Sequence, residues 1–390
     1  MKEYYADLHI HIGRTRSGKA VKITGAKTLT FSNIIEVASE RKGLDMIGII
    51  DCHSPEVIEE IEAGIRSGEI TEMAGGGLHY RSMAIIPGSE IEIYDQNCHG
   101  PIHILAYFPN MEAMKTFSAW MSNHVKNITL SSQRIYCDGQ TLQETVKSLG
   151  GLFIPAHVFT PFKSLYGKGV RKSLEEVFNP KLIDAIELGL SSDTYLVEGI
   201  KELGSYTFLT NSDAHSLGKI AREYQKLLLK EPSFTELEKA LKEKEGRKVT
   251  ANYGLNPLLG KYYQTVCGAC LHKMPGIGES CSECGGRKII KGVSTRIAEL
   301  SDSGTVEKKR ARPPYIHQVP LDFIPGLGPK SMEILLRAFE TEMNILHEVT
   351  LEQLSEVVPL KLARFIDSAR RGILDFDAGG GGKYGKVKKK

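Results

Sequence analysis

The sequence has no apolar run of the roughly 18 residues that a membrane-spanning helix needs, so we expect no membrane partner. Its first residues, MKEYYADLHI, also lack the apolar region of a signal peptide, and we expect a cytoplasmic protein. Disorder is excluded, because 41% of the 390 residues are hydrophobic and only 25% are charged. At about 150 residues per domain, the length predicts two or three domains.

Cysteine is scarce, and its count of seven is odd, which argues against a framework of disulfides. Four of the seven form two CxxC pairs in the segment CGACLHKMPGIGESCSECGG, namely Cys267, Cys270, Cys281 and Cys284. In a cytosolic protein this spacing indicates metal ligands, and four thiolates fill a tetrahedral zinc site without an open catalytic position. We therefore predict a structural zinc, with four unliganded thiols as the alternative. Cys52, Cys98 and Cys137 have no partner pattern and are predicted to be ordinary thiols.

Net charge is also small, +3, but it is unevenly distributed. Residues 1–260 contain 29 Lys and Arg against 32 Asp and Glu, whereas residues 261–390 contain 21 against 15. This asymmetry indicates a catalytic body followed by a region that binds a polyanion.

The first 250 residues alternate short apolar runs with segments of helical periodicity, a pattern typical of βα units around a parallel sheet. Helices are predicted over 33–43, 55–68, 140–150 and 194–204. Seven strands are predicted, over 7–13, 46–51, 84–92, 102–108, 151–157, 184–188 and 207–215. The economical closure of seven such units is an α/β barrel, whose chemistry gathers at the carboxyl ends of the strands.

Most of the predicted strands end in His, Asp or Glu. His9 and His11 stand two residues apart, so both side chains project to one side of their strand and can bind one metal or bridge two. A carboxylate that bridges two metals would most naturally be Glu90. Any one of these histidines alone would be read as an ordinary core residue, but six in one domain indicate a metal site. The strand-end residues are Asp7, His9, His11, Asp51, His53, Glu90, His103, His157, Asp213 and His215.

In their order along residues 1–250, these motifs resemble the PHP family of metal-dependent phosphoesterases. The resemblance implies a distorted (β/α)7 barrel that holds two or three divalent metals, whether Zn, Mn, Mg or Fe. The implied ligands are His9, His11, His53, Glu90, His103, His157, Asp213 and His215. Among them, His9, Glu90, His157 and Asp213 would carry catalysis by activating a water. The chain departs from the family pattern in having Cys52 directly before His53, and the loop GRTRSGK, with Arg14, Arg16 and Lys19, where the family often has another ligand. These basic side chains could hold a substrate phosphate.

Near the C-terminus, IPGLGPKSMEILL resembles the helix-hairpin-helix motif of DNA repair proteins. Gly326 and Gly328 would let backbone N–H groups bind a DNA phosphate, and Lys330 would add charge. The segment VVPLKLARFIDSARRG resembles a second, degenerate copy, with Arg370 and Arg371 as further phosphate contacts. The alternative for the Gly-rich segment is a plain turn between helices.

The predicted organisation is a metallophosphoesterase barrel (1–255), a zinc module (256–300), a linker (301–314), an all-α tandem helix-hairpin-helix domain (315–377) and a basic flexible tail (378–390). This arrangement resembles the endonuclease Q family of DNA repair enzymes. The resemblance implies a nucleoid-associated endonuclease that binds damaged double- or single-stranded DNA. It would cut on the 5′ side of uracil, hypoxanthine, xanthine and abasic sites, leaving a 3′-hydroxyl and a 5′-phosphate. Dependence on a replication clamp stays open.

Two alternatives remain: a phosphatase or exonuclease of the PHP type without lesion selectivity, and an inactive scaffold that binds DNA. An endonuclease would have to flip the altered base out of the duplex. Predicted walls for the flipped base are GGGLHYRSM and the loop FTPFKSLYGKG after His157.

Overall fold

Seven strands at the centre of the N-terminal part of the chain are joined into a ring by sheet pairing and by backbone hydrogen bonds. The structure is a computed structural model that describes residues 1–274, 278–302, 310–374, 376–377, 379 and 382–387. Backbone hydrogen bonds from Asp184 N to Phe153 O (3.0 Å) and from Ala214 N to His9 O (3.1 Å) complete the ring. The strands are β1 (Lys2–Ile10), β2 (Met46–Ile49), β5 (Met83–Ile93), β6 (Ile102–Tyr107), β8 (Leu152–Pro155), β9 (Ile186–Glu187) and β10 (Phe208–Leu209). The predicted seven-stranded α/β barrel is confirmed.

One strand runs against the predicted parallel pattern. β6 pairs antiparallel with both β5 and β8. Only residues 94–101 connect β5 to β6, which is too short for the helical crossover that a parallel neighbour requires. The barrel is therefore distorted at this side, while β1, β2 and β5 are parallel.

Additional strands extend the sheet beyond the ring. β11 (Tyr224–Leu229) and β12 (Lys248–Gly254) continue it antiparallel from β1, and β15 (Tyr315–His317) adds a parallel strand beside β12. The chain therefore returns to the barrel after the cysteine-rich segment. Short strands β3 (Thr71–Glu72), β4 (Leu78–Tyr80) and β7 (Arg134–Ile135) lie beside β5 or β4.

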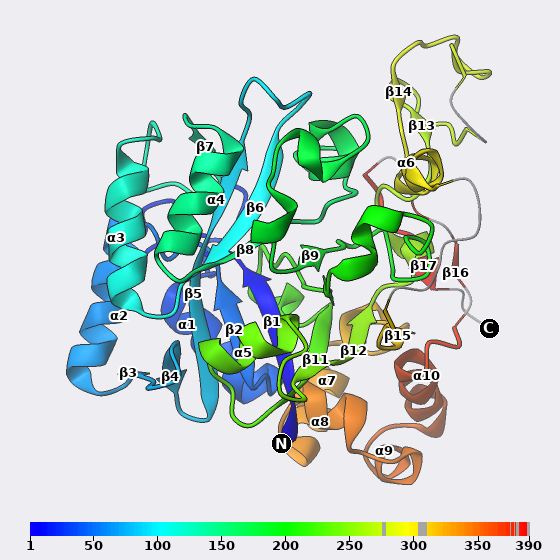
Figure 1. The fold of residues 1–390 in the computed structure, drawn as a ribbon. Coiled ribbons are helices and arrows are strands. Elements are labelled where there is room, and N and C mark those ends of the chain that lie inside the picture. The colour runs from blue at the N-terminus through cyan, green and yellow to red at the C-terminus, as the bar shows by residue number, and fades with distance from the viewer. Residues whose placement is uncertain (275–277, 303–309, 375, 378, 380–381, 388–390) are drawn as a thin grey trace.

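Helices cover the barrel on its outer side (Figure 1). Phe117 and Val146 join one large buried apolar cluster, whereas Phe234 and Leu237 join a second. The predicted helix over 194–204 is wrong, because the structure has only a single turn of 3-10 helix there, at Lys201–Ser205. The helices are α1 (Phe31–Glu36), α2 (Pro55–Ser67), α3 (Met111–Ser122), α4 (Gly139–Ser148) and α5 (Phe234–Leu241).

Beyond the barrel, the chain forms a cysteine-rich hairpin and then a group of helices that pack on the barrel (Figure 1). The hairpin consists of β13 (Val266–Cys267) and β14 (Ile289–Ile290), followed by α6 (Val293–Leu300). The helical group consists of α7 (Pro329–Phe339), α8 (Glu342–His347), α9 (Leu351–Val357) and α10 (Leu360–Arg370). Among the helices of the described ranges, none combines the length and apolar character of a membrane span.

The contact between the helical group and the barrel is built around His347. Its ring stacks on Tyr5 with 4.5 Å between centroids, and its Nε2 lies 2.6 Å from the Tyr224 hydroxyl. Burial lowers the pKa of His347 to about 3, so the imidazole is neutral. Nearby, the Lys42 ammonium lies 2.8 Å from the Glu342 carboxylate, and both side chains are largely buried. Apolar packing and a shielded ion pair thus attach the helices to the barrel.

The C-terminal segment also packs against the rest of the protein. β16 (Phe376–Asp377) pairs antiparallel with β17 (Lys386–Val387), and Gly385 N donates to Leu259 O at 2.9 Å. Where the structure describes the predicted flexible tail, at residues 379 and 382–387, it is docked, so that part of the prediction is wrong; residues 378, 380–381 and 388–390 lie outside the described residues. In the predicted linker, residues 303–309 also lie outside them, and Arg312 donates to Leu203 O of the barrel at 2.8 Å.

Candidate active site

Histidines 9 and 11 stand at the end of β1, where both side chains are fully buried. The two imidazoles lie with ring centroids 5.3 Å apart, as the spacing of two residues predicts. In each ring the Nδ1 atom forms a hydrogen bond with a carboxylate. The Nε2 atom is buried and has no hydrogen-bond partner among the described residues. A buried nitrogen with an open lone pair fits a metal ligand.

Around these two nitrogens, three groups of potential ligands overlap. His9, His11 and Glu90 form the first, His11, Asp213 and His215 the second, and Glu90, His103 and His157 the third. Within each group the ligand atoms lie within 4.8 Å of one another, and His11 and Glu90 belong to two groups each. The Asp213 Oδ1 atom lies 3.5 Å from His9 Nε2 and 3.2 Å from His215 Nε2. Such a set of imidazoles and shared carboxylates suits two or three adjacent divalent metals.

Two further carboxylates orient these histidines from behind. Glu187 accepts from His9 Nδ1 at 2.9 Å, from Asn211 Nδ2 at 2.8 Å and from His157 N at 2.8 Å. Asp51, which the sequence placed at a strand end, accepts from His11 Nδ1 at 3.0 Å. Carboxylates on the outer nitrogen fix the tautomer and direction of a metal-binding imidazole. Glu187 is not among the predicted site residues, although it lies at the end of the predicted strand 184–188, as the other site residues do at theirs.

His53 is placed differently from the other predicted ligands. Its Nδ1 lies 2.8 Å from the Ser89 hydroxyl and its Nε2 lies 3.2 Å from Leu130 O, so both ring nitrogens have partners. Within the described ranges it joins none of the three groups. The preceding Cys52 is fully buried, and its thiol donates to Ile49 O. Burial raises the pKa of Cys52 to about 12, so it is a neutral core thiol.

Charge at the centre of the site is set by Glu90 and Lys22. Burial would raise the pKa of Glu90, but His103 and Lys22 outweigh burial and hold it well below its usual range. Lys22 Nζ lies 3.0 Å from the Glu90 carboxylate and 2.6 Å from the Ser132 hydroxyl, a contact that the sequence did not suggest. In contrast, Lys19 of the predicted phosphate-binding loop is exposed and pairs with Glu56 at 3.0 Å.

Backbone strain marks two of the site residues. His157 has a φ of 33° and Asp213 a φ of 45°, a region that residues other than glycine adopt at a cost of about 1–3 kcal/mol. Opposite His157, a Cβ on Gly189 would lie 2.8 Å from the His157 Cβ, so glycine is required for this approach. Strained positions of this kind are typical of functional sites.

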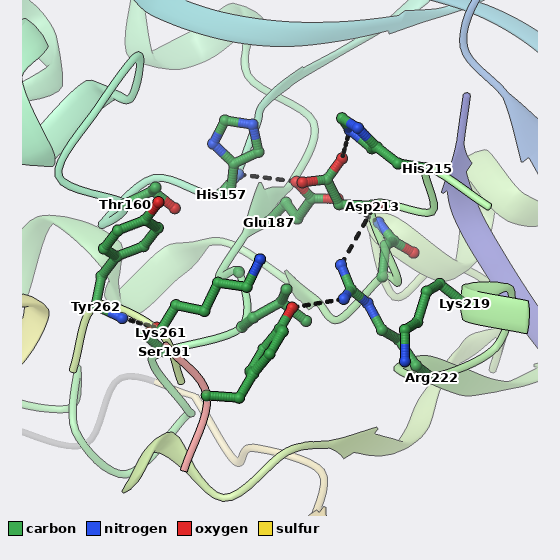
Figure 2. A pocket seen from close by; sticks show the side chains of 14 residues that line it. His157, Thr160, Glu187, Ser191, Asp213, His215, Lys219, Arg222, Lys261 and Tyr262 are labelled. Carbon is green, nitrogen blue, oxygen red and sulfur yellow. Dashed lines mark hydrogen bonds and ion pairs between the residues drawn. The ribbon is translucent and has the colours of Figure 1, made fainter. Parts of the chain in front are cut away.

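A cavity of about 380 Å³ opens beside these residues, within the roughly 300–1,000 Å³ of ligand pockets (Figure 2). Figure 2 shows Asp213 and His215 on one side and Lys261 and Tyr262, from the region after the barrel, on the other. Of the two predicted base-binding walls, the loop after His157 contributes Thr160, whereas residues 75–83 do not line the cavity. Further lining residues are Glu187, Leu190, Ser191, Asn211, Lys219, Arg222 and Tyr384.

The four cysteines converge as the spacing predicts. Cys267 Sγ lies 3.6 Å from Cys284 Sγ, and Cys270 Sγ lies 3.6 Å from Cys281 Sγ. Tetrahedral zinc with Zn–S bonds of about 2.3 Å would place sulfurs about 3.8 Å apart. The backbone N–H groups of Cys270 and Ala269 lower the pKa of Cys267 to about 6, which favours the thiolate that zinc requires.

The predicted helix-hairpin-helix glycines lie at the start of α7. Gly326 has a φ of 89°, and a Cβ on Gly326 or Gly328 would have open space around it. The neighbouring Lys330 is exposed, and a groove between the starts of α7 and α10 contains Pro325 and Gly326 on one side and Pro359 on the other. The backbone here is accessible to a phosphate. Arg370 instead donates to Asp367 at 2.6 Å, inside the helical group.

Known proteins resemble this chain along nearly its whole length. No family profile matches it. The chain is 58% identical over 388 residues to the uncharacterized protein YqxK of Bacillus subtilis, and the match covers 100% of both. The crystal structure of the lesion-specific endonuclease PfuEndoQ from Pyrococcus furiosus has a TM-score of 0.84 and 31% identity, over 99% of this chain and 95% of that one.

A second solved structure, endonuclease Q in complex with a 27-mer duplex substrate with an abasic lesion at the active site, gives a TM-score of 0.84 and 31% identity. This match covers 100% of the present chain and 97% of the other. Barrel, cysteine-rich hairpin and C-terminal helices thus correspond together, and the chain belongs to the endonuclease Q family.

Proposed function

We propose that this protein is a metal-dependent DNA repair endonuclease. It hydrolyses the phosphodiester 5′ of uracil, hypoxanthine, xanthine and abasic sites and leaves a 3′-hydroxyl and a 5′-phosphate. The observation that carries the proposal is a cluster of three overlapping ligand groups, of which His157, Asp213 and His215 line a cavity, in a chain whose fold matches a lesion-specific endonuclease from end to end. Duplex binding through phosphates, without reading sequence, would associate the enzyme with the nucleoid.

The eight predicted metal ligands would divide into seven that hold metals and His53, which would act as a buried support. The ionised Glu90 and Asp213 provide the negative charge that divalent cations need. Glu187 and Asp51 keep the Nε2 atoms of His9 and His11 directed at the centre. Zn, Mn, Mg or Fe bound there would supply Lewis acidity for the attack of water on the scissile phosphate. His9, Glu90, His157 and Asp213 are the residues on which catalysis depends most.

Lesion selectivity would come from the cavity. A deaminated base differs from a normal one in an exocyclic group that is paired inside the duplex, so the enzyme must flip the nucleotide to inspect it. The Tyr262 ring offers a surface for stacking, and the hydroxyls of Thr160 and Ser191 can donate or accept hydrogen bonds. Abasic sites would be accepted because flipping costs least where no base is stacked.

The test is a nicking assay on duplexes that carry one uracil, one inosine, one abasic site or no lesion, with Mn, Mg and Zn supplied separately. We expect a single cut 5′ of each lesion, and loss of cutting in Asp213→Ala and His9→Ala. The control is His79→Ala, a histidine on β4 outside the three groups, which should cut normally.

Other outcomes would favour the alternatives. Equal cutting of damaged and normal duplexes, or progressive loss of nucleotides from the ends, would indicate a nuclease without lesion selectivity. Binding without cutting under every metal would indicate a scaffold. Repeating the assay with single-stranded DNA tests that expected substrate, and adding a replication clamp tests whether cutting depends on the clamp.

A further inference from the structure

Three cationic side chains line the cavity beside Asp213, but they differ in their partners (Figure 2). Lys219 Nζ pairs with Asp322 at 2.6 Å. Arg222 and Lys261 form no ion pair with a carboxylate within the part of the chain that the structure describes. Two half-buried positive charges without an anionic partner leave room for an anion from outside the protein.

The guanidinium of Arg222 is held on three sides. Its Nε donates to Ser212 O at 2.7 Å and its Nη2 donates to Asp213 O at 3.2 Å. Its Nη1 donates to the Tyr384 hydroxyl at 2.6 Å. The first two acceptors lie just after β10, where Asp213 is a predicted metal ligand. The third acceptor belongs to the C-terminal segment.

The same tyrosine contacts Lys261. Lys261 Nζ lies 4.6 Å from the centroid of the Tyr384 ring, within the range of a cation–π interaction. On another side, the Tyr384 ring meets Phe323 edge to face at 5.8 Å. One side chain therefore fixes both cations that lack a carboxylate.

Backbone contacts hold Tyr384 in this place. Gly382 N donates to Lys261 O at 3.1 Å and Gly385 N donates to Leu259 O at 2.9 Å. A Cβ on Gly385 would lie 3.0 Å from Leu258 O and closer still to Asp377 O, so the segment can approach this closely only because residue 385 is glycine. The described part of the segment is thus built into the wall of the cavity.

We propose that Tyr384 is a positioning residue that holds Arg222 and Lys261 as a binding pair for a DNA phosphate next to the lesion, and that the C-terminal segment is therefore part of the substrate pocket. This inference rests on the proposed function, because the phosphate is that of the DNA substrate. Arginine suits the planar, bidentate recognition of phosphate, provided that its side chain is held in one orientation.

The first test is single-turnover nicking of an abasic duplex. Tyr384→Phe keeps the ring but removes the hydroxyl, and we expect the rate to fall about tenfold, the effect of losing one hydrogen bond to a charged group. The nicking rate of Tyr384→Ala should fall further, because this variant also removes the aromatic ring that Lys261 contacts. Lys248→Ala, an exposed cation on β12 outside this segment and the cavity, should stay within about twofold of the natural protein.

A double-variant cycle separates positioning from simple packing. If Tyr384 acts through Arg222, adding Tyr384→Phe to Arg222→Gln should change the rate by less than about twofold. An unchanged rate in Tyr384→Phe alone, or losses that multiply in the double variant, would overturn the proposal. Circular dichroism and thermal unfolding of each variant check that the fold is intact.

A second readout does not need cleavage. In the His9→Ala variant, hydrogen exchange of the amides of residues 382–387 should slow more with an abasic duplex than with an undamaged one. Equal protection by both duplexes would show that the segment lies outside the pocket and would overturn the proposal. If the natural protein fails to nick but the abasic duplex still protects the segment selectively, the proposed function fails and the assignment of the pocket stands.

Discussion

Glu187 helps to fix the positions of two histidines of the candidate active site, His9 and His157. Its two carboxylate oxygens accept hydrogen bonds from the His9 ring, the Asn211 amide and the backbone N–H of His157. An acceptor with two equivalent oxygens can serve all three donors, whereas an amide has only one accepting oxygen. The carboxylate therefore links β1, β8 and the strand end after β10 at one point behind the ligand groups.

The first prediction concerns this carboxylate. Glu187→Gln should fold but lose about 10- to 100-fold in metal affinity and nicking rate, the usual cost of removing the partner of a metal-binding histidine. Elemental analysis after dialysis and single-turnover nicking measure the two effects. Glu238→Gln on α5, a half-buried residue that pairs with Lys242 away from the ligand groups, is the matched control. Unchanged metal content in Glu187→Gln would show that the contact does not support the ligands.

A second prediction concerns a carboxyl group outside the ligand groups. Burial raises the pKa of Glu223 to about 8, and its Oε2 has no hydrogen-bond partner among the described residues. The folded protein therefore binds this proton more tightly than the unfolded chain, and the associated stability is present below about pH 4.5 and is lost as the pH rises towards 8.

Glu223→Gln removes this dependence on pH. Relative to the natural protein, the variant should gain stability between pH 5 and pH 8, by up to about 4 kcal/mol at 1.36 kcal/mol per pH unit. Urea unfolding of both proteins at the two pH values measures the difference. A constant difference in the free energy of unfolding would mean that Glu223 does not titrate in this range.

The sequence pattern predicts which side chains gather at the strand ends, but it does not predict the residues that support them. Period-two alternation on one strand is enough to place His9 beside His11. The contact of His9 with Glu187 joins residues 178 positions apart, and Lys22 reaches Glu90 from a loop without regular spacing. His53 shows the opposite case, because its strand-end position is right while Ser89 and Leu130 occupy its ring nitrogens. Such partners are fixed by tertiary packing, which no local pattern encodes.

Among the secondary-structure units, the cysteine hairpin is the simplest to test. Too few apolar residues lie between Cys267 and Cys284 to form a core, so zinc should hold β13 and β14 together. Cys267→Ser with Cys270→Ser should remove one zinc per chain and loosen the hairpin, without emptying the barrel site. Elemental analysis and limited proteolysis measure both effects. Zinc content equal to that of the natural protein would refute the assignment.

The C-terminal segment shows where composition misleads. Its Gly and Lys content predicts a disordered end, yet Tyr384 and Gly385 dock against the barrel and residues 258–261. Glycine here serves close backbone approach instead of flexibility, a distinction that depends on the neighbouring chain.

DNA binding and DNA cutting should depend on different parts of the protein and should therefore be separable by mutation. Gly328 has an ordinary φ and open space around its Cβ position, so Gly328→Ala should fold normally while its methyl group hinders a phosphate. We expect weaker binding to damaged and undamaged duplexes alike, a salt slope smaller by about 0.9 per lost contact, and unchanged lesion preference. Anisotropy at two salt concentrations and nicking at saturating enzyme measure this. Loss of discrimination at unchanged affinity would instead make the helices the lesion reader.

The packing of His347 between Tyr5 and Tyr224 has a consequence for the geometry of the substrate. These contacts hold the helical group against the barrel, so the proposed phosphate-binding turn at α7 would stand at a constant distance from the proposed metal ligands. The proposed phosphate contact and the proposed cleavage site would then lie a fixed distance apart along a bound duplex. If a lesion lies too near the end of the DNA, the duplex would not reach the turn at α7 and that phosphate contact would be lost. The cutting rate should then fall abruptly at one duplex length, instead of declining gradually.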